Sequence, residues 1–430
     1  MVDLKTKLAR LGSPGGGPAP KREPLAADEP PAELTEDREQ TLESLRQKMR
    51  ELLGRDAGPK RVRPELDVRD LPFAEVETGT GPLFQRRLTL AASAHVGRMP
   101  VSAGADARAE MLALLALDPS LNQIRPQAAL YLDTETTGLS GGAGTVAFLV
   151  GMAWFDAESR LVVEQLLLRQ PGEEQPLLEL VAQRVQRSEL LVTFNGKAFD
   201  LPLLASRYVM NRLPPLEPRP HLDLLHVGRR LHRARLGQCR LVTLESEVLG
   251  LVRGEDIDGS EVPQRYSHYL RTGDAEGLRA VVDHNAQDVM SLAALVGLYG
   301  EPLGVLHPRD LAALARTLRR ARALDQAARA AELAVEQGGG TDALRVRGEI
   351  SKARGDRLSA LADFESLSAE VDDPAVRLEL AKLYEHYVKD LHRALNVAEQ
   401  GTGETDEAWQ RRKERLRTRV RRARGRKTSK

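Results

Sequence analysis

Residues 128–155 read AALYLDTETTGLSGGAGTVAFLVGMAWF, two apolar runs separated by an acidic and glycine-rich loop. Each run has the length and content of a buried strand. A third run follows at 161–168, then helical spacing over 173–187 and another strand-like run at 189–194. Three strands in succession predict antiparallel neighbours. The order strand, strand, strand, helix, strand therefore indicates a mixed sheet.

Helical spacing dominates the next part of the chain. The expected helices cover residues 201–210, 223–232, 241–249 and 275–298. Apolar residues on one face of each helix would pack against the sheet. We predict an α/β domain over residues 128–300.

The chain before this domain has two parts. Residues 1–60 contain a Pro-, Gly- and charge-rich segment at 13–40, expected to be a flexible arm, and one short amphipathic helix at 41–53. Residues 61–127 carry turn signals between β-type runs, with a hairpin expected within 71–101. This β-containing lead-in either stands apart or belongs to the main domain.

The last third of the chain favours helical hairpins. Asp356 and Asp390 each precede an alanine by four residues and lie 34 residues apart. That spacing is the period of tetratricopeptide repeats, and a weaker third copy is expected near Asp325. We predict an all-α, tetratricopeptide-like repeat domain over residues 305–402, whose surface offers a site for a protein partner.

Residues 403–430 form a strongly basic tail. Residues 411–430 carry twelve Lys or Arg and one acid, Glu414, although the whole chain has a net charge of only +1. Twelve cations attract polyanions at low salt, so contact with RNA or DNA is one interpretation. A solvated tail without a partner is the other.

Composition excludes several classes of protein. The 430 residues, 41% hydrophobic and 29% charged, indicate globular domains rather than a disordered or fibrous chain. A single cysteine, Cys239, excludes an internal disulfide and a thiolate zinc site. The longest apolar stretch, 146–155, is half of the ~20 residues that cross a bilayer. We expect a cytoplasmic protein that has no membrane partner.

Carboxylates stand where the predicted sheet ends. Asp133 and Glu135 occupy alternate positions of one strand, so both point to the same face. Asp200 follows the strand that ends in FNGKAFD, at the start of a helix. Such crowding is tolerable when divalent cations lie between the oxygens, and these hard ligands select Mg or Mn.

A fourth acid, Asp288, follows His284 by four residues on a predicted helix. Residues at this spacing share a helix face, so the two side chains would point to the same place. A metal could bind the carboxylate while the imidazole accepts a proton from water. The alternative for His284 is an ordinary helix histidine without a chemical role.

These motifs resemble the DEDD superfamily of 3′-5′ exonucleases, which have an RNase H-like fold. More closely, DTETTGLSGGAGTVAFLVG, FNGKAFDLPLL, HLDLLHVGRRL and HNAQDVMSLA are similar to the YprB group of RNase H-like proteins. The resemblance covers about residues 128–300. The third motif combines the spacing of one DEDD subgroup with the histidine of the other.

The resemblance implies a mixed five-stranded RNase H-like sheet and hydrolysis of phosphodiester bonds. It implies two Mg or Mn ions held by the four carboxylates, with His284 orienting or deprotonating water. The implied catalytic set is Asp133, Glu135, Asp200, His284 and Asp288. The implied or suggested contacts to nucleic acid come from Thr134, Thr136, Asn195, Arg229 and Arg230.

Several residues keep two interpretations. Asp223 is either an N-cap or a fifth acid, with the cap favoured. Asn195 either turns the chain or orients the substrate or Asp200. The glycines of 139–145 do not make a phosphate loop, because no Gly-Lys-Ser/Thr and no helix follow them. The arginines of 229–240 either contact phosphates or form a solvated helix face.

Two functions remain in competition at this point. The first is a metal-dependent 3′-5′ exonuclease. The second is a catalytically inactive scaffold, in which the acids are structural and the repeats and the tail bind partners or nucleic acid. The complete set of four acids favours the enzyme.

Overall fold

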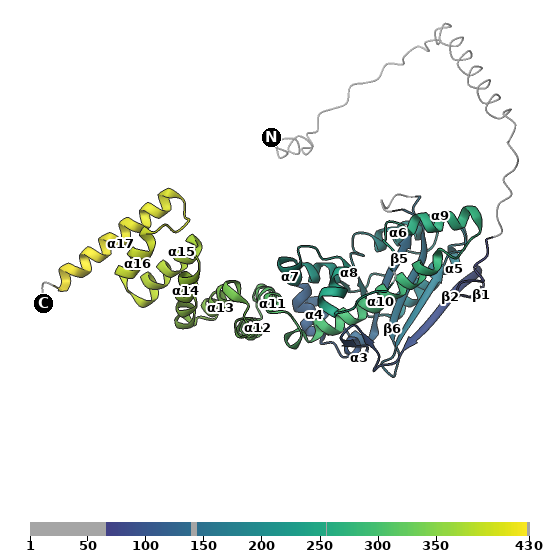
Figure 1. Cartoon of the computed structure of the whole chain (residues 1–430), viewed down its shortest axis with the longest axis horizontal. Helices are drawn as coiled ribbons and strands as arrows, with labels where there is room; N and C mark the ends of the chain where they lie inside the picture. Colours follow the sequence, from purple (N-terminus) through teal and green to yellow (C-terminus); the bar gives the residue numbers. More distant parts are fainter. Residues whose placement is uncertain (1–65, 139–143, 255, 428–430) are drawn as a thin grey trace, which may run out of the picture. The chain divides into compact units, whose positions relative to one another are not determined.

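The computed structural model describes residues 66–138, 144–254 and 256–427 (Figure 1). The predicted arm at 13–40 and the short helix at 41–53 lie outside the described residues, as does most of the glycine-rich loop.

One seven-stranded mixed sheet organises the first part of the described chain. Its strand order is β1-β2-β7-β6-β5-β8-β9. The bounds are β1 Ala74–Thr78, β2 Gly81–Leu90, β5 Ala129–Thr136, β6 Ala147–Phe155, β7 Leu161–Leu167, β8 Leu190–Thr193 and β9 His221–Asp223. Strands β5, β6 and β7 are antiparallel, and β8 and β9 run parallel to β5. The predicted mixed sheet and its strand-strand-strand-helix-strand order are confirmed.

The sheet has seven strands rather than the expected five. Strands β7, β6, β5, β8 and β9 are the five, and the predicted hairpin β1–β2 extends the same sheet by pairing β2 with β7. The β-containing lead-in therefore belongs to the main sheet. A second, two-stranded sheet is formed by β3 His95–Val96 and β4 Met99–Pro100.

Alternation along the strands divides the core into two layers. On β5, Leu130 and Leu132 join one cluster and Tyr131 joins the other, because successive side chains point to opposite faces. One face is covered by α5 Gln175–Arg187, α6 Asp200–Met210 and α9 Val262–Thr272. The other face is covered by α3 Ser102–Ala105, α4 Ala109–Ala116, α7 Leu224–Leu236, α8 Leu241–Leu244 and α10 Leu278–Gly300. Helix α8 continues into a π-turn, η3 Glu245–Leu249.

Helical hairpins follow, as predicted. The helices are α11 Pro308–Arg320, α12 Leu324–Glu336, α13 Gly340–Arg354, α14 Arg357–Glu370, α15 Pro374–Leu383 and α16 Leu391–Glu399. Each packs against the next (Figure 1). The turns within the hairpins contain left-handed residues at Arg322, Gly355 and Lys389, which lie 33 and 34 residues apart.

The aspartates of the predicted repeat are helix caps. Asp356 accepts a hydrogen bond from the Ser359 amide and Asp390 from the Arg393 amide. In the first hairpin the cap position belongs to Ala323, so the expected copy at Asp325 is displaced by two residues. The tetratricopeptide-like assignment itself stays a prediction.

The first helices of this region share a core with the sheet domain, whereas α14 to α16 belong to a separate apolar cluster. Helix α11 packs on α7 and α4, and one apolar cluster runs from the sheet through Leu314 to Ile350. At this junction buried His232 lies 2.9 Å from Asp310 through Nδ1 and 3.0 Å from the Tyr299 hydroxyl through Nε2.

The basic segment is a packed helix, α17 Asp406–Lys427, and not a solvated tail. Leu416 is fully buried, and the Trp409 indole donates to the Ala398 carbonyl at 2.6 Å. Arg415 and Arg419 both pair with buried Glu385. Part of the positive charge is thus balanced within the protein. Across the described residues, no helix combines the length and apolar character needed to traverse a bilayer.

Candidate metal centre

The carboxyl end of β5 carries the first two acids. Asp133 and Glu135 project toward α10, the same side as Tyr131, because they alternate with Leu132 and Thr134 along the strand. Asp133 pairs in register with Gly151 of β6, and a bulge follows at Glu135 and Thr136. Both residues are largely, though not fully, buried at the sheet end.

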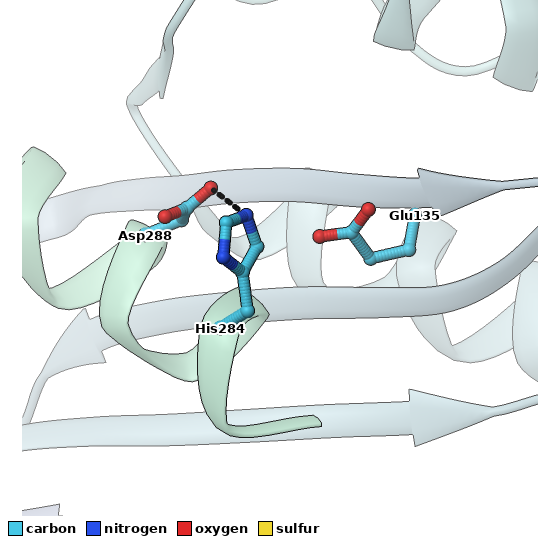
Figure 2. A group of neighbouring side chains, drawn as sticks. All are labelled: Glu135, His284 and Asp288. Atoms are coloured by element: carbon cyan, nitrogen blue, oxygen red, sulfur yellow. Dashed lines mark ion pairs between the residues drawn. The ribbon is translucent and has the colours of Figure 1, made fainter. Parts of the chain in front are cut away.

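Helix α10 brings His284 and Asp288 to this place. Glu135, His284 and Asp288 each offer one ligand atom within 4.8 Å of the others (Figure 2). His284 Nε2 lies 3.6 Å from Asp288 Oδ2, and the imidazole stands between the two carboxylates in Figure 2. The helical spacing predicted this shared face.

Asp200 reaches the same edge as the first residue of α6. Its Oδ1 accepts a hydrogen bond of 2.6 Å from the Thr134 hydroxyl on β5. Its charge also acts on Asp133 and Glu135. The structure therefore brings together all four predicted carboxylates and His284.

Crowding and burial disfavour the ionised carboxylates. Burial raises the pKa of Asp133 well above its ordinary value, and the neighbouring acids raise it further. Burial likewise raises the pKa of Glu135 to about 7 and that of Asp200 to about 6. A divalent cation would supply the missing positive charge, and carboxylate oxygens beside one imidazole suit Mg or Mn. The donor set fits such an ion.

Two further residues in contact with the acids were not predicted. Asn285 of α10 donates to Asp133 Oδ2 at 2.9 Å. Arg253, on the segment between η3 and α9, donates to Asp288 Oδ1 and to Glu245. Asp256 of the same segment lies 2.7 Å from His284 Nδ1. Asn285 directly follows His284 in the quoted motif, whereas no pattern marks Arg253 or Asp256.

Asp223 stabilises the turn after β8 by accepting hydrogen bonds from its backbone amides. Asp223 caps α7 through the Leu225 amide and accepts from the amides of Asn195 at 2.8 Å and Lys197 at 3.1 Å. The N-cap interpretation of Asp223 is confirmed. Asn195 has a left-handed backbone with φ 67°, so it turns the chain. At Gly196 a Cβ would lie 2.4 Å from Thr193 Oγ1, which requires glycine.

A cavity of about 440 Å³ opens beside the acids. Its lining comprises Asp133, Thr134, Thr136, Gly138, Thr145, Phe194, Asn195, Ala198, Phe199, Asp200, Pro202, Leu203 and Ser206. Phe199, 55% exposed, is an aromatic contact that the sequence analysis did not single out. The predicted substrate contacts Thr134, Thr136 and Asn195 all lie here.

Arg229 and Arg230 lie elsewhere. Neither lines the cavity. Arg230 on α7 donates to the Leu115 carbonyl of α4 at 2.9 Å, and burial lowers its pKa. Arg229 is exposed on the same helix.

The five-strand order 7-6-5-8-9, with carboxylates at the end of the central strand β5, defines an RNase H-like domain. Residues 130–299 match the model of the RNase H superfamily. The chain is also 35% identical over 302 residues to YprB, an uncharacterized protein of Bacillus subtilis (strain 168); the match covers 67% of this chain and 73% of that protein. The chain belongs to the YprB family of the RNase H superfamily.

Proposed function

We propose that this protein is a metal-dependent nuclease that removes nucleotides from the 3′ end of a nucleic-acid strand. The observation that carries the proposal is the crowding of four carboxylates with raised pKa values at the end of β5, two of which, Asp133 and Asp200, also line a cavity. Membership of the RNase H superfamily supports hydrolysis of phosphodiester bonds.

Two Mg or Mn ions would be held by Asp133, Glu135, Asp200 and Asp288. Bound there, the ions would polarise the scissile phosphate and make the attacking water more acidic. Asn285 holds the Asp133 carboxylate by its hydrogen bond, and Thr134 does the same for Asp200. These contacts keep two of the ligands in place before substrate arrives.

His284 is the group that accepts or orients the proton of the nucleophilic water. Asp256 Oδ1 and Arg253 Nη1 lie 2.7 and 3.0 Å from Nδ1, and Nε2 lies 3.6 Å from Asp288 Oδ2. When Nδ1 carries its proton toward Asp256, Nε2 is the basic nitrogen that a general base needs within reach of the reacting water.

The cavity would take the terminal nucleotide. Its volume of about 440 Å³ lies in the range of small-molecule sites. The exposed ring of Phe199 offers a stacking surface for a base. The hydroxyls of Thr134 and Thr136 and the Asn195 amide offer hydrogen bonds to the sugar or the phosphate. A pocket for one terminal unit favours removal from an end over internal cleavage.

The alternative function is a nucleic-acid- or partner-binding scaffold. The contact of Arg253 with Asp288 favours it, because that arginine compensates one acid without any metal. The helical hairpins would then carry the function by binding a protein partner.

The test uses 5′-labelled single-stranded RNA and DNA, and internally labelled circles of the same sequences, with Mg or Mn or with chelator. We expect a ladder that shortens from the 3′ end with metal alone, and intact circles. Asp288→Asn should abolish this degradation. Asp283→Asn is the control and should not, because Asp283 lies exposed on the same helix and its side chain pairs with Arg86. Cleaved circles would contradict the exonuclease mode, and inert wild type would favour the scaffold.

A further inference from the structure

We propose that Arg253 is a positioning residue that fixes the orientation of Asp288 as a ligand of the candidate metal centre. The proposal rests on the metal-binding role proposed above and extends it to a residue outside the four-carboxylate set. We call Arg253 and Glu245 together the arginine clamp.

The arginine clamp is buried and has two points of attachment. The Arg253 side chain is 8% exposed and Glu245 is fully buried. Arg253 Nε donates to Glu245 Oε2 and Nη2 donates to Glu245 Oε1, both at 2.6 Å. Two parallel hydrogen bonds of this kind fix the plane of the guanidinium.

The backbone places the two clamp residues side by side. Glu245 begins the π-turn η3, which ends at Leu249 and is followed by Gly250 with a left-handed φ of 65°. The Leu251 amide then returns to the Glu245 carbonyl at 2.8 Å. The chain therefore folds back, and Arg253 lies beside Glu245 eight residues later.

The fixed guanidinium also holds the metal ligand. Nη2 donates to Asp288 Oδ1, so that oxygen is already occupied. The other oxygen, Oδ2, is the one 3.6 Å from His284 Nε2. The rotation of the Asp288 carboxylate is therefore restrained, and Oδ2 is the oxygen that the guanidinium leaves open to an ion.

The same segment fixes His284. Arg253 Nη1 donates to Asp256 Oδ2 at 3.1 Å, and Asp256 Oδ1 lies 2.7 Å from His284 Nδ1. Arg253 Nη1 also lies 3.0 Å from His284 Nδ1 itself. One arginine therefore sets the orientation of a ligand and, both directly and through Asp256, of the neighbouring imidazole. Groups that orient metal ligands in this way affect metal affinity strongly.

A competing role for Arg253 predicts the opposite result. If the guanidinium were only a counter-ion that occupies the place of a metal, its removal would tighten metal binding. If it positions Asp288, its removal weakens metal binding even though a positive charge is lost. The direction of the change in Mn²⁺ affinity separates the two roles.

The experiment measures the Mn²⁺ dissociation constant by calorimetry and by the electron paramagnetic resonance of free Mn²⁺. It compares wild type with Arg253→Lys and with the double variant Arg253→Met, Glu245→Gln, which removes both charges of the arginine clamp. Arg271→Met, exposed on α9, is the matched control. Circular dichroism and thermal unfolding verify that each variant is folded.

We expect the double variant to bind Mn²⁺ at least about tenfold more weakly than wild type, with the control unchanged. Arg253→Lys keeps the positive charge but cannot make the two parallel hydrogen bonds to Glu245. It should therefore weaken Mn²⁺ binding as well. Unchanged or tighter binding in a folded double variant would overturn the clamp, as would wild type that binds no Mn²⁺. If wild type binds Mn²⁺ but does not cleave nucleic acid, the proposed nuclease function fails. The positioning role of Arg253 would still be supported by weaker Mn²⁺ binding in the double variant.

Discussion

At the scale of one residue, Glu135 of the candidate metal centre lowers the stability of the folded protein when no cation is bound. Burial raises its pKa from an ordinary 4.5 to about 7. The folded protein thus binds this proton more tightly than the unfolded chain does, and stability is lost as the pH rises through 7. We expect Glu135→Gln to be roughly 1–2 kcal/mol more stable than wild type near pH 8 in chelator, with the difference shrinking toward pH 5.

Denaturant unfolding at several pH values, always in chelator, checks this expectation. Glu158→Gln, an exposed glutamate in a turn, is the control and should follow the wild-type curve. Parallel curves for wild type and Glu135→Gln would show that Glu135 carries no such cost.

A substitution at Gly151 tests whether Asn285 positions the Asp133 carboxylate. A Cβ on Gly151 would lie 2.3 Å from Asn285 Oδ1, so Gly151→Ala must displace the amide that donates to Asp133. We expect a loss of about 1–3 kcal/mol in stability and lower metal-dependent nuclease activity. Unfolding and activity measurements on Gly151→Ala and on Gly259→Ala, which has open space around its Cβ, check both effects. Full activity in a stable Gly151→Ala would exclude a role for Asn285.

The sequence predicted the residues whose geometry follows a regular period. Asp133 and Glu135 share a face because a strand alternates, and His284 and Asp288 share one because a helix repeats after four residues. Arg253 lies on an irregular segment, 35 residues before the acid that it contacts. No local period connects such a pair, so only the tertiary structure reveals it.

At the scale of elements, the turns of the helical hairpins carry a testable strain. Lys389 adopts a left-handed φ of 64° where the preceding hairpin has Gly355 at φ 87°. A residue with a Cβ in the left-handed region destabilises the folded state by about 1 kcal/mol. Glycine has no such penalty, but it loses more conformational entropy on folding, which offsets part of the gain. We expect Lys389→Gly to stabilise the protein by up to about 0.5–1 kcal/mol and Gly355→Lys to destabilise it by about 1 kcal/mol.

Thermal unfolding of these two variants measures the effect. Substitution of Lys352, a helical lysine paired with Glu379, by Gly provides the opposite control, because glycine within a helix destabilises it. A destabilised Lys389→Gly would contradict the equivalence of the two turns.

The elements that the sequence predicted are those that are long and regular. Strand β9 has three residues, too few to show alternation, and it falls where a helix was expected to begin. The pairing of β2 with β7 joins residues up to 83 positions apart, which local patterns do not specify. The extent of the basic segment could be predicted from the sequence. Its packing could not, because it depends on contacts with Glu385 and Ala398 in other elements.

At the scale of the whole molecule, the sheet domain and helices α11 to α13 share one core. A chain that ends at Gly304 would expose the face packed on Leu311 and Leu314 and would leave buried His232 without Asp310. We expect this truncation to lose cooperative unfolding, whereas a chain that starts at Pro64, where the second compact unit begins, should unfold like the full protein. Calorimetry of both truncations decides the matter. A cooperative transition in the chain ending at Gly304 would contradict the shared core.

The central claim is that the carboxylates at the end of β5 hold metal ions that hydrolyse a phosphodiester bond. The most direct measurement is Mn-dependent release of nucleotides from single-stranded RNA and DNA by wild type and by Asp133→Asn, with nucleic-acid binding recorded in parallel. We predict release by wild type that stops in chelator and falls at least about a hundredfold in Asp133→Asn, with binding retained. No release by wild type, or equal release by Asp133→Asn, would contradict the claim.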